Sequence, residues 1–218
     1  MKKIIISLAI MMLSPIMGQV KFGLKFSPNL SFTSVRSDSV FSKSGLGGRF
    51  IGGMFVDINI TDNAAFHIGG EYAPKKISLM TNDTTTSYNL QYIQVPFGLK
   101  FFTNEFADRF KIYFLIDPNL AFKISEKSNS DNNYKLDLIK YADSKNKKAF
   151  NFFDVGINIG AGTEIKIGES TFVFAGISYN RGLINALNPL LKDPKNVSYS
   201  KLGRVTNGLL NLDLGIKF

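Results

Sequence analysis

The chain has 218 residues, no cysteine, 19 glycines, 20 phenylalanines and a formal net charge of +9. The lack of cysteine excludes a disulfide framework. Basic residues alternate with acidic ones instead of gathering in runs, which disfavours nucleic-acid binding. Abundant glycine and aromatic residues, with few helix-like apolar stripes, favour β structure.

Residues 1–18 have the pattern of a secretory signal peptide. A positively charged start precedes a short apolar core over residues 4–13, and we predict cleavage before Gln19. The core is too short to cross a bilayer as a helix, and no later apolar run reaches the roughly 18 residues of a membrane helix. We therefore expect an exported chain whose residues 19–218 fold as one domain.

The rest of the chain is a succession of stretches in which apolar and polar side chains alternate with the period of a β-strand. The pattern predicts eight strands, over residues 20–34, 46–60, 64–79, 88–102, 110–124, 153–167, 171–183 and 207–218. In the last strand the apolar phase consists of Leu210, Leu212, Leu214, Ile216 and Phe218. The phase of the seventh is harder to read, and we place on its outer face Val173, Ala175, Ile177 and Tyr179.

The fourth strand has an irregular pattern. Tyr88, Leu90 and Tyr92 occupy one phase, but the apolar pattern continues from Ile93 to Phe101 with the opposite parity. One extra residue in a strand has this effect. We therefore predict a β-bulge that keeps both groups on the apolar face.

The connections between the predicted strands alternate in length. Long polar connections are expected over residues 35–45, 80–87, 125–150 and 184–204, and short ones over 61–63, 103–109 and 168–170. Outer-membrane barrels have short turns on the periplasmic side and long loops outside, and in an even-stranded barrel both termini are then periplasmic. Because no helix separates any two strands, we predict an all-β fold. It is a closed eight-stranded antiparallel up-and-down transmembrane β-barrel in the outer membrane of a Gram-negative bacterium.

The charged phase of the strands is expected to face the lumen, because a charge on the lipid face costs about 2–4 kcal/mol at mid-bilayer. A soluble barrel of the lipocalin type also alternates, but it turns its apolar phase inward. The export signal, the aromatic last residue and the connection lengths favour the membrane. An eight-stranded barrel is filled by side chains, so we predict a structural polar network instead of a wide channel. Its predicted members are Arg49, Asp57, His67, Glu71, Lys100, Lys111, Asp117, Asp154, Glu164 and Asp213.

Residues for catalysis or metal binding are sparse. His67 is the only histidine, which with the lack of cysteine argues against a transition-metal site. Some eight-stranded barrels modify lipids, but His67 lies in the lumen phase near a short turn, where we expect a hydrogen-bonded structural role. Asp154 and Glu164 are too far apart along one strand for acid/base work unless a neighbouring strand supplies a partner. We expect no catalytic residue, no cofactor and no metal.

Basic residues in the last predicted connection, over 184–204, leave two readings open. They are either contacts to lipid phosphates at the outer surface or parts of a solvated loop. These residues are Lys192, Lys195, Lys201 and Arg204.

Several stretches resemble the motifs of one known family. Residues 23–29 (G-L-K-F-S-P-N) resemble its first strand, residues 90–100 (L-Q-Y-I-Q-V-P-F-G-L-K) its most specific motif, and residues 179–185 its seventh strand. On these motifs the chain is similar to the PorT-like outer-membrane β-barrel family of Bacteroidetes. Gln94 stands where that family usually has glutamate and Ser178 where arginine is expected, so a lumen pair between the two positions is neutral here.

The resemblance implies an eight-stranded outer-membrane barrel in a family with one member tied to protein secretion and gliding. We expect a non-enzymatic structural or accessory component of the outer membrane, linked to such an apparatus. The alternatives are a small-solute pore or ligand-binding barrel and, less favoured, a lipid-modifying enzyme. Expected partners are outer-membrane lipid or lipopolysaccharide and proteins of a secretion system, with no nucleic acid. The barrel-assembly machinery is expected to recognise an insertion signal at Leu214, Ile216 and Phe218.

Overall fold

The computed structural model describes residues 20–37, 42–43, 47–81, 84–106, 109–130, 149–188 and 203–218. Its named elements are β1 (Val20–Ser37), β2 (Ser42–Lys43), β3 (Gly47–Thr61), β4 (Ala64–Thr81), β5 (Thr84–Phe102), β6 (Phe110–Ser130), β7 (Phe153–Lys166), β8 (Phe172–Gly182) and β9 (Gly203–Lys217). The predicted signal peptide lies outside the described residues, as do Lys192, Lys195 and Lys201. Within the described ranges there is no helix whose length and apolar character would let it cross a bilayer.

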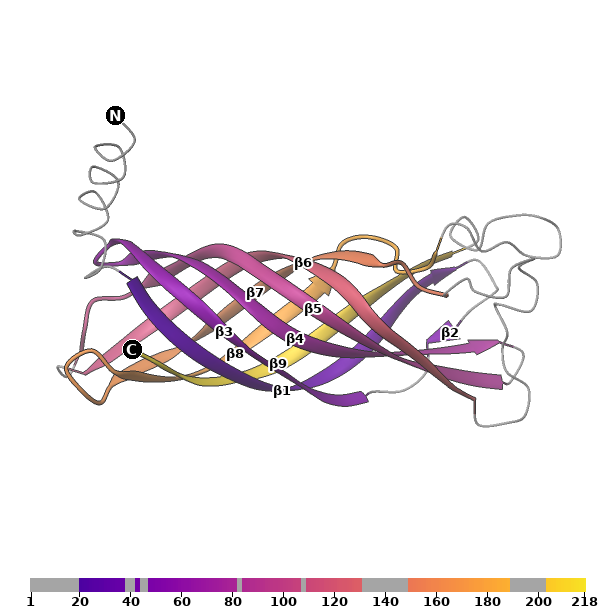
Figure 1. Ribbon diagram of the computed structural model, residues 1–218, viewed down its shortest axis with the longest axis horizontal. Coiled ribbons are helices and arrows are strands. Elements are labelled where there is room, and N and C mark those ends of the chain that lie inside the picture. Colours follow the sequence, from indigo (N-terminus) through magenta and orange to yellow (C-terminus); the bar gives the residue numbers. More distant parts are fainter. Residues whose placement is uncertain are drawn as a thin grey trace, which may run out of the picture.

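Eight of the strands form a closed antiparallel barrel (Figure 1). Around the ring the order is β1, β3, β4, β5, β6, β7, β8 and β9, and the pairing of β9 with β1 closes it. The short β2 pairs only with the end of β4, where Ser42 lies opposite Met80. The prediction of a closed eight-stranded up-and-down barrel is therefore confirmed.

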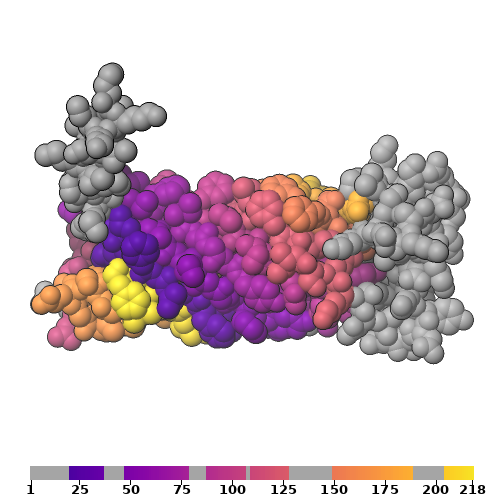
Figure 2. Space-filling model, viewed as in Figure 1, coloured from indigo at the N-terminus to yellow at the C-terminus, as the bar shows by residue number. Residues whose placement is uncertain are grey.

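The barrel is an elongated cylinder with two distinct ends (Figures 1 and 2). The end that contains Val20 and Phe218 we call the proximal end. It also contains the tight turn at Asp62–Asn63 between β3 and β4. The opposite end, where β6 ends at Ser130 and β9 begins at Gly203, we call the distal end.

Two hairpin strands reach further toward the distal end than the sequence pattern predicts. β4 continues to Thr81 and β5 begins at Thr84, and these two residues pair directly. The predicted long connection over residues 80–87 is therefore wrong. Threonine is β-branched and favours extended backbone, so the Thr84–Thr86 run continues the strand although it is polar. A membrane-crossing strand needs only about 9–11 residues, so this hairpin is longer than the span requires.

Alternation divides the side chains between an apolar outer wall and a polar interior. Phe22 and Met54 are 61% and 66% exposed, whereas Asp57 on the opposite face is fully buried. The predicted phase of β8 is confirmed, because Ile177 and Tyr179 face outward while Phe172 and Phe174 are buried. Further outward apolar side chains are Leu24, Phe26, Leu30, Ile68, Ile93, Leu99, Phe114, Ile116, Ile159, Leu210, Leu212 and Leu214.

The predicted change of phase within β5 is wrong. Tyr88, Leu90 and Tyr92 are each at most 3% exposed, and they face inward with the other even-numbered residues of the strand. The irregularity belongs to the neighbouring strand: Gln91 pairs with Ser125 and Tyr92 with Lys123, which leaves one extra residue in β6. The three side chains mimic the lipid face because they are apolar, but they pack inside the barrel.

Candidate functional site

The lumen near the proximal end contains two carboxylates bridged by two lysines. Glu164 of β7 accepts a bond from the Nζ of Lys100 of β5 at 2.6 Å, and from the Nζ of Lys217 of β9 at 2.6 Å. Asp57 of β3 completes the ring, with its Oδ2 at 3.4 Å from Lys100 and 3.3 Å from Lys217. All four side chains are at most 5% exposed. Two negative and two positive charges therefore balance inside the barrel, as burial requires.

His67 of β4 extends this ring. Its Nδ1 lies 2.6 Å from Oδ1 of Asp57, and its ring lies 5.0 Å from that of Phe55. The Nε2 atom is buried and has no hydrogen-bond partner in the described part of the chain. The contact of Nδ1 with Oδ1 orients the Asp57 carboxylate toward the two lysines.

Aromatic rings surround the two lysines of the ring. The Nζ of Lys100 lies 4.3 Å from the ring centre of Tyr113 and 5.3 Å from that of Phe174. Lys217 lies 5.1 Å from Phe102 and 5.4 Å from Phe172. These are cation–π distances, and the rings occupy space that water would fill in a channel.

A second polar layer lies above this ring, toward the distal end. Lys25 forms an ion pair with Glu71, which also accepts a bond from Gln94 at 3.4 Å. Ser27 donates to Asp213 at 2.6 Å. Asn158 donates to Asp117 at 3.3 Å. Ser178 accepts a bond from Asn211 at 3.0 Å, so Gln94 and Ser178 have separate partners.

The next layer combines ion pairs with aromatic packing. Lys75 of β4 pairs with Asp154 of β7 at 2.9 Å, and its Nζ lies 4.8 Å from the ring centre of Tyr92. Lys123 of β6 donates to Glu126 and to the carbonyl oxygen of Phe150. The second of these bonds ties the segment before β7 to the inner wall.

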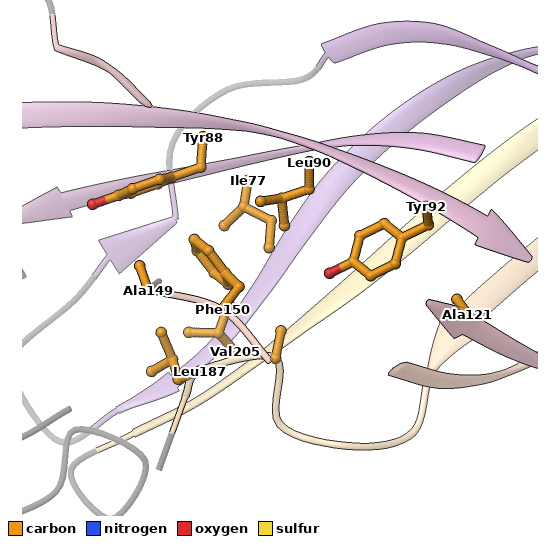
Figure 3. Close-up of a cluster of buried hydrophobic side chains, with 10 residues drawn as sticks. Ile77, Tyr88, Leu90, Tyr92, Ala121, Ala149, Phe150, Leu187 and Val205 are labelled. Atoms are coloured by element: carbon orange, nitrogen blue, oxygen red, sulfur yellow. The ribbon is translucent and has the colours of Figure 1, made fainter. Parts of the chain in front are cut away.

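A cluster of buried apolar side chains, which we call the plug, packs inside the barrel near its distal end (Figure 3). Phe150 and Leu187 form a β-bridge that joins the segment before β7 to the segment after β8. The Phe150 ring packs edge-on against Tyr88, with ring centres 5.0 Å apart. The plug consists of Ile77, Tyr88, Leu90, Tyr92, Ala121, Ala149, Phe150, Ala186, Leu187 and Val205.

The structure brings some of the predicted lumen residues together and separates others. Asp57, His67, Lys100 and Glu164 meet in the charged ring, and Glu71, Asp117, Asp154 and Asp213 lie buried in the layers on its distal side. Two members lie outside this buried network. Arg49 is half-buried and donates to Asn89, and Lys111 pairs with Glu105 at 3.3 Å near the proximal end.

The predicted set omits three buried lysines and the whole plug. The lysines are Lys75, Lys123 and Lys217, and their positions in the charged phase of their strands were the available signal. Nothing in the local pattern marks residues 149–150 and 186–187 as lumen-filling. In the described residues, no group of three His, Cys, Asp or Glu side chains is placed to bind a metal ion.

A cylinder with an apolar outer wall and a charged, filled interior defines a membrane-inserted β-barrel. A family model described as "Outer membrane protein beta-barrel domain" matches residues 14–188, and the chain belongs to that family. It is thus an outer-membrane β-barrel protein of a Gram-negative bacterium.

Solved structures of the same kind are similar in fold. The outer membrane protein OprG of Pseudomonas aeruginosa is 10% identical, with a TM-score of 0.50 over 90% of this chain and 95% of that one. Neisserial surface protein A is 13% identical, with a TM-score of 0.46 over 90% of this chain and 95% of that one. No curated protein sequence matches the chain significantly.

Proposed function

We propose that this protein is a non-conducting, non-enzymatic barrel that serves as a structural or accessory component of the outer membrane. The observation that carries the proposal is the filled lumen. The ring of Asp57, Lys100, Glu164 and Lys217 fills the lumen near its proximal end, and the plug around Phe150 fills it near the distal end. A solute pore would need a continuous polar path, and side chains interrupt it at several levels.

Ion conductance in planar lipid bilayers tests this proposal. We expect the purified, folded protein to give no steady single-channel currents, under conditions in which a general porin does. The variant Phe150→Ala should also fail to conduct, because the charged ring near the proximal end remains in place after the plug is opened. Steady channels in the unmodified protein would contradict the proposal and favour the small-solute pore.

We also propose that the distal end is extracellular and that both termini are periplasmic. The connection between β6 and β7 and that between β8 and β9 are long and both leave from the distal end. The turn at Asp62–Asn63 and the turn at residues 167–171 are short and proximal. This asymmetry is typical of outer-membrane barrels.

A finer part of the proposal is membership of the PorT-like family, with proteins of a secretion or gliding apparatus as partners. The motif over residues 90–100 supports it. Leu90, Tyr92, Gln94 and Lys100 of this motif all face the lumen and make the contacts described above. The side chains of this motif therefore serve packing inside the lumen. The link to secretion rests on the resemblance to the PorT-like family.

We propose that the barrel-assembly machinery recognises Leu214, Ile216 and Phe218. Phe218 is 51% exposed on the outer wall, and its backbone exchanges two hydrogen bonds with that of Phe22. Phe218→Ala keeps these backbone bonds and should lower the amount of folded barrel in outer-membrane fractions several-fold. The matched control is Phe22→Ala, which removes an outward aromatic ring beside it. An equal loss in both variants would contradict recognition and indicate a general effect of the ring.

A further inference from the structure

Three arginines lie together on the outer wall near the distal end. Arg36 of β1, Arg181 of β8 and Arg204 of β9 are all exposed, although they belong to three neighbouring strands. They line a cavity of about 280 Å³ together with the hydroxyl side chains of Ser34 and Thr206. We call this group the arginine cluster.

Within the part of the chain that the structure describes, no acidic side chain neutralises the arginine cluster. Arg36 and Arg204 lie directly opposite each other in the register of β1 and β9, an arrangement that is unfavourable for like charges. No carboxylate in the described ranges forms an ion pair with any of the three. Arg204 donates a bond to the carbonyl oxygen of Leu183, which uses one of the five N–H donors of its guanidinium group. The cluster therefore favours an anion.

On the proximal side of the arginine cluster, the outward side chains of the wall are first aromatic and then aliphatic. The rings of Phe32 and Tyr179 stack with centres 6.0 Å apart and planes 9° from parallel. Gly208 allows this stack, because a Cβ there would lie 2.2 Å from the Phe32 ring. Leu30 and Leu210 continue the wall toward the membrane centre, both nearly half exposed. Tyrosine is enriched at the interface between acyl chains and headgroups, so Tyr179 favours headgroup depth for the arginines beside it.

We propose that the arginine cluster binds the phosphate groups of a phosphorylated glycolipid of the outer leaflet, the lipid A class, whose acyl chains pack on the Phe32–Tyr179 wall. The proposal rests on the proposed orientation, which places the distal end in that leaflet. Guanidinium groups bind phosphate through paired hydrogen bonds. Ser34 and Thr206 add hydroxyls that can bond to the sugar. Three positive charges suit a headgroup with more than one phosphate better than a phospholipid with one.

Native mass spectrometry of the detergent-solubilised protein with bisphosphorylated lipid A tests the proposal. We expect lipid A to be retained in a one-to-one complex. The triple variant R36Q/R181Q/R204Q should bind it at least about tenfold more weakly, since each basic residue near a lipid surface contributes roughly a factor of five. The triple lysine variant keeps the charge and should bind with intermediate strength. Arg109→Gln, a charge change at an exposed position near the proximal end, is the matched control and should bind as the parent does.

Three results would overturn the proposal. One is equal binding of fully dephosphorylated lipid A, which would assign retention to the acyl chains alone. Another is equal binding of phosphatidylglycerol, or full competition by millimolar inorganic phosphate, which would indicate a general anion surface. The third is a loss of lipid A binding in Arg109→Gln that equals the loss in the triple glutamine variant. Heat-modifiable mobility on gels checks that every variant is folded. Bilayer conductance tests the proposed function separately, so a failure of the lipid A proposal does not imply that the barrel conducts.

Discussion

Replacing Glu164 with glutamine is expected to lower the free energy of unfolding by about 3–5 kcal/mol. Glu164 neutralises Lys100 and Lys217, with both ammonium groups at 2.6 Å from its oxygens. Glutamine keeps the shape but leaves one positive charge in excess in a buried site. Its amide nitrogen also points a donor at one ammonium. Urea unfolding in detergent micelles, followed by circular dichroism because the chain has no tryptophan, measures the change.

Two further variants separate charge imbalance from a general loss of packing. The double variant E164Q/K217Q restores neutrality, with Lys100 paired to Asp57, and should be more stable than E164Q alone. Lys111→Gln removes a partly exposed pair with Glu105 and should cost less than about 1 kcal/mol. If the double variant is as unstable as the sum of its single variants, the four charges do not act as one balanced ring.

The sequence predicts the barrel well because one physical constraint acts on every strand. Lipid excludes charge from one face, so Asp57, Glu164 and Lys217 must all take the lumen phase of β3, β7 and β9. That phase can be read from residues two apart, without knowledge of the rest of the chain. Strand number and the direction of most faces follow from it.

The pairings inside the lumen cannot be read in this way. Asp57 and Lys217 are far apart in sequence, and their contact depends on the stagger between strands around the closed barrel. Tyr88, Leu90 and Tyr92 show a different limit. Their apolar character is compatible with lipid or with an internal plug, and only the partners Phe150 and Leu187 decide between them. These partners lie in segments outside the predicted strands, where alternation gives no information.

Replacing Gly98 with alanine is expected to destabilise the barrel by about 1–3 kcal/mol or more. A Cβ on Gly98 would lie 2.2 Å from the carbonyl oxygen of Ile116 and 2.5 Å from the Cα of Asp117. These are backbone atoms of β6, so no side chain can rotate away. The two strands must separate to admit the methyl group, which weakens the β5–β6 pairing in the middle of a closed sheet.

Gly52→Ala is the control that isolates this close approach. Gly52 lies in the interior of β3, but a Cβ there would meet no atom within 4 Å. Alanine at this position restricts the unfolded chain and fills open space on the outer wall, so stability should rise by about 0.5–1 kcal/mol. Opposite signs for the two variants in urea unfolding are therefore expected. A similar loss in both would mean that strand glycines are needed here for flexibility, and that the contact between β5 and β6 at Gly98 does not limit closure of the barrel.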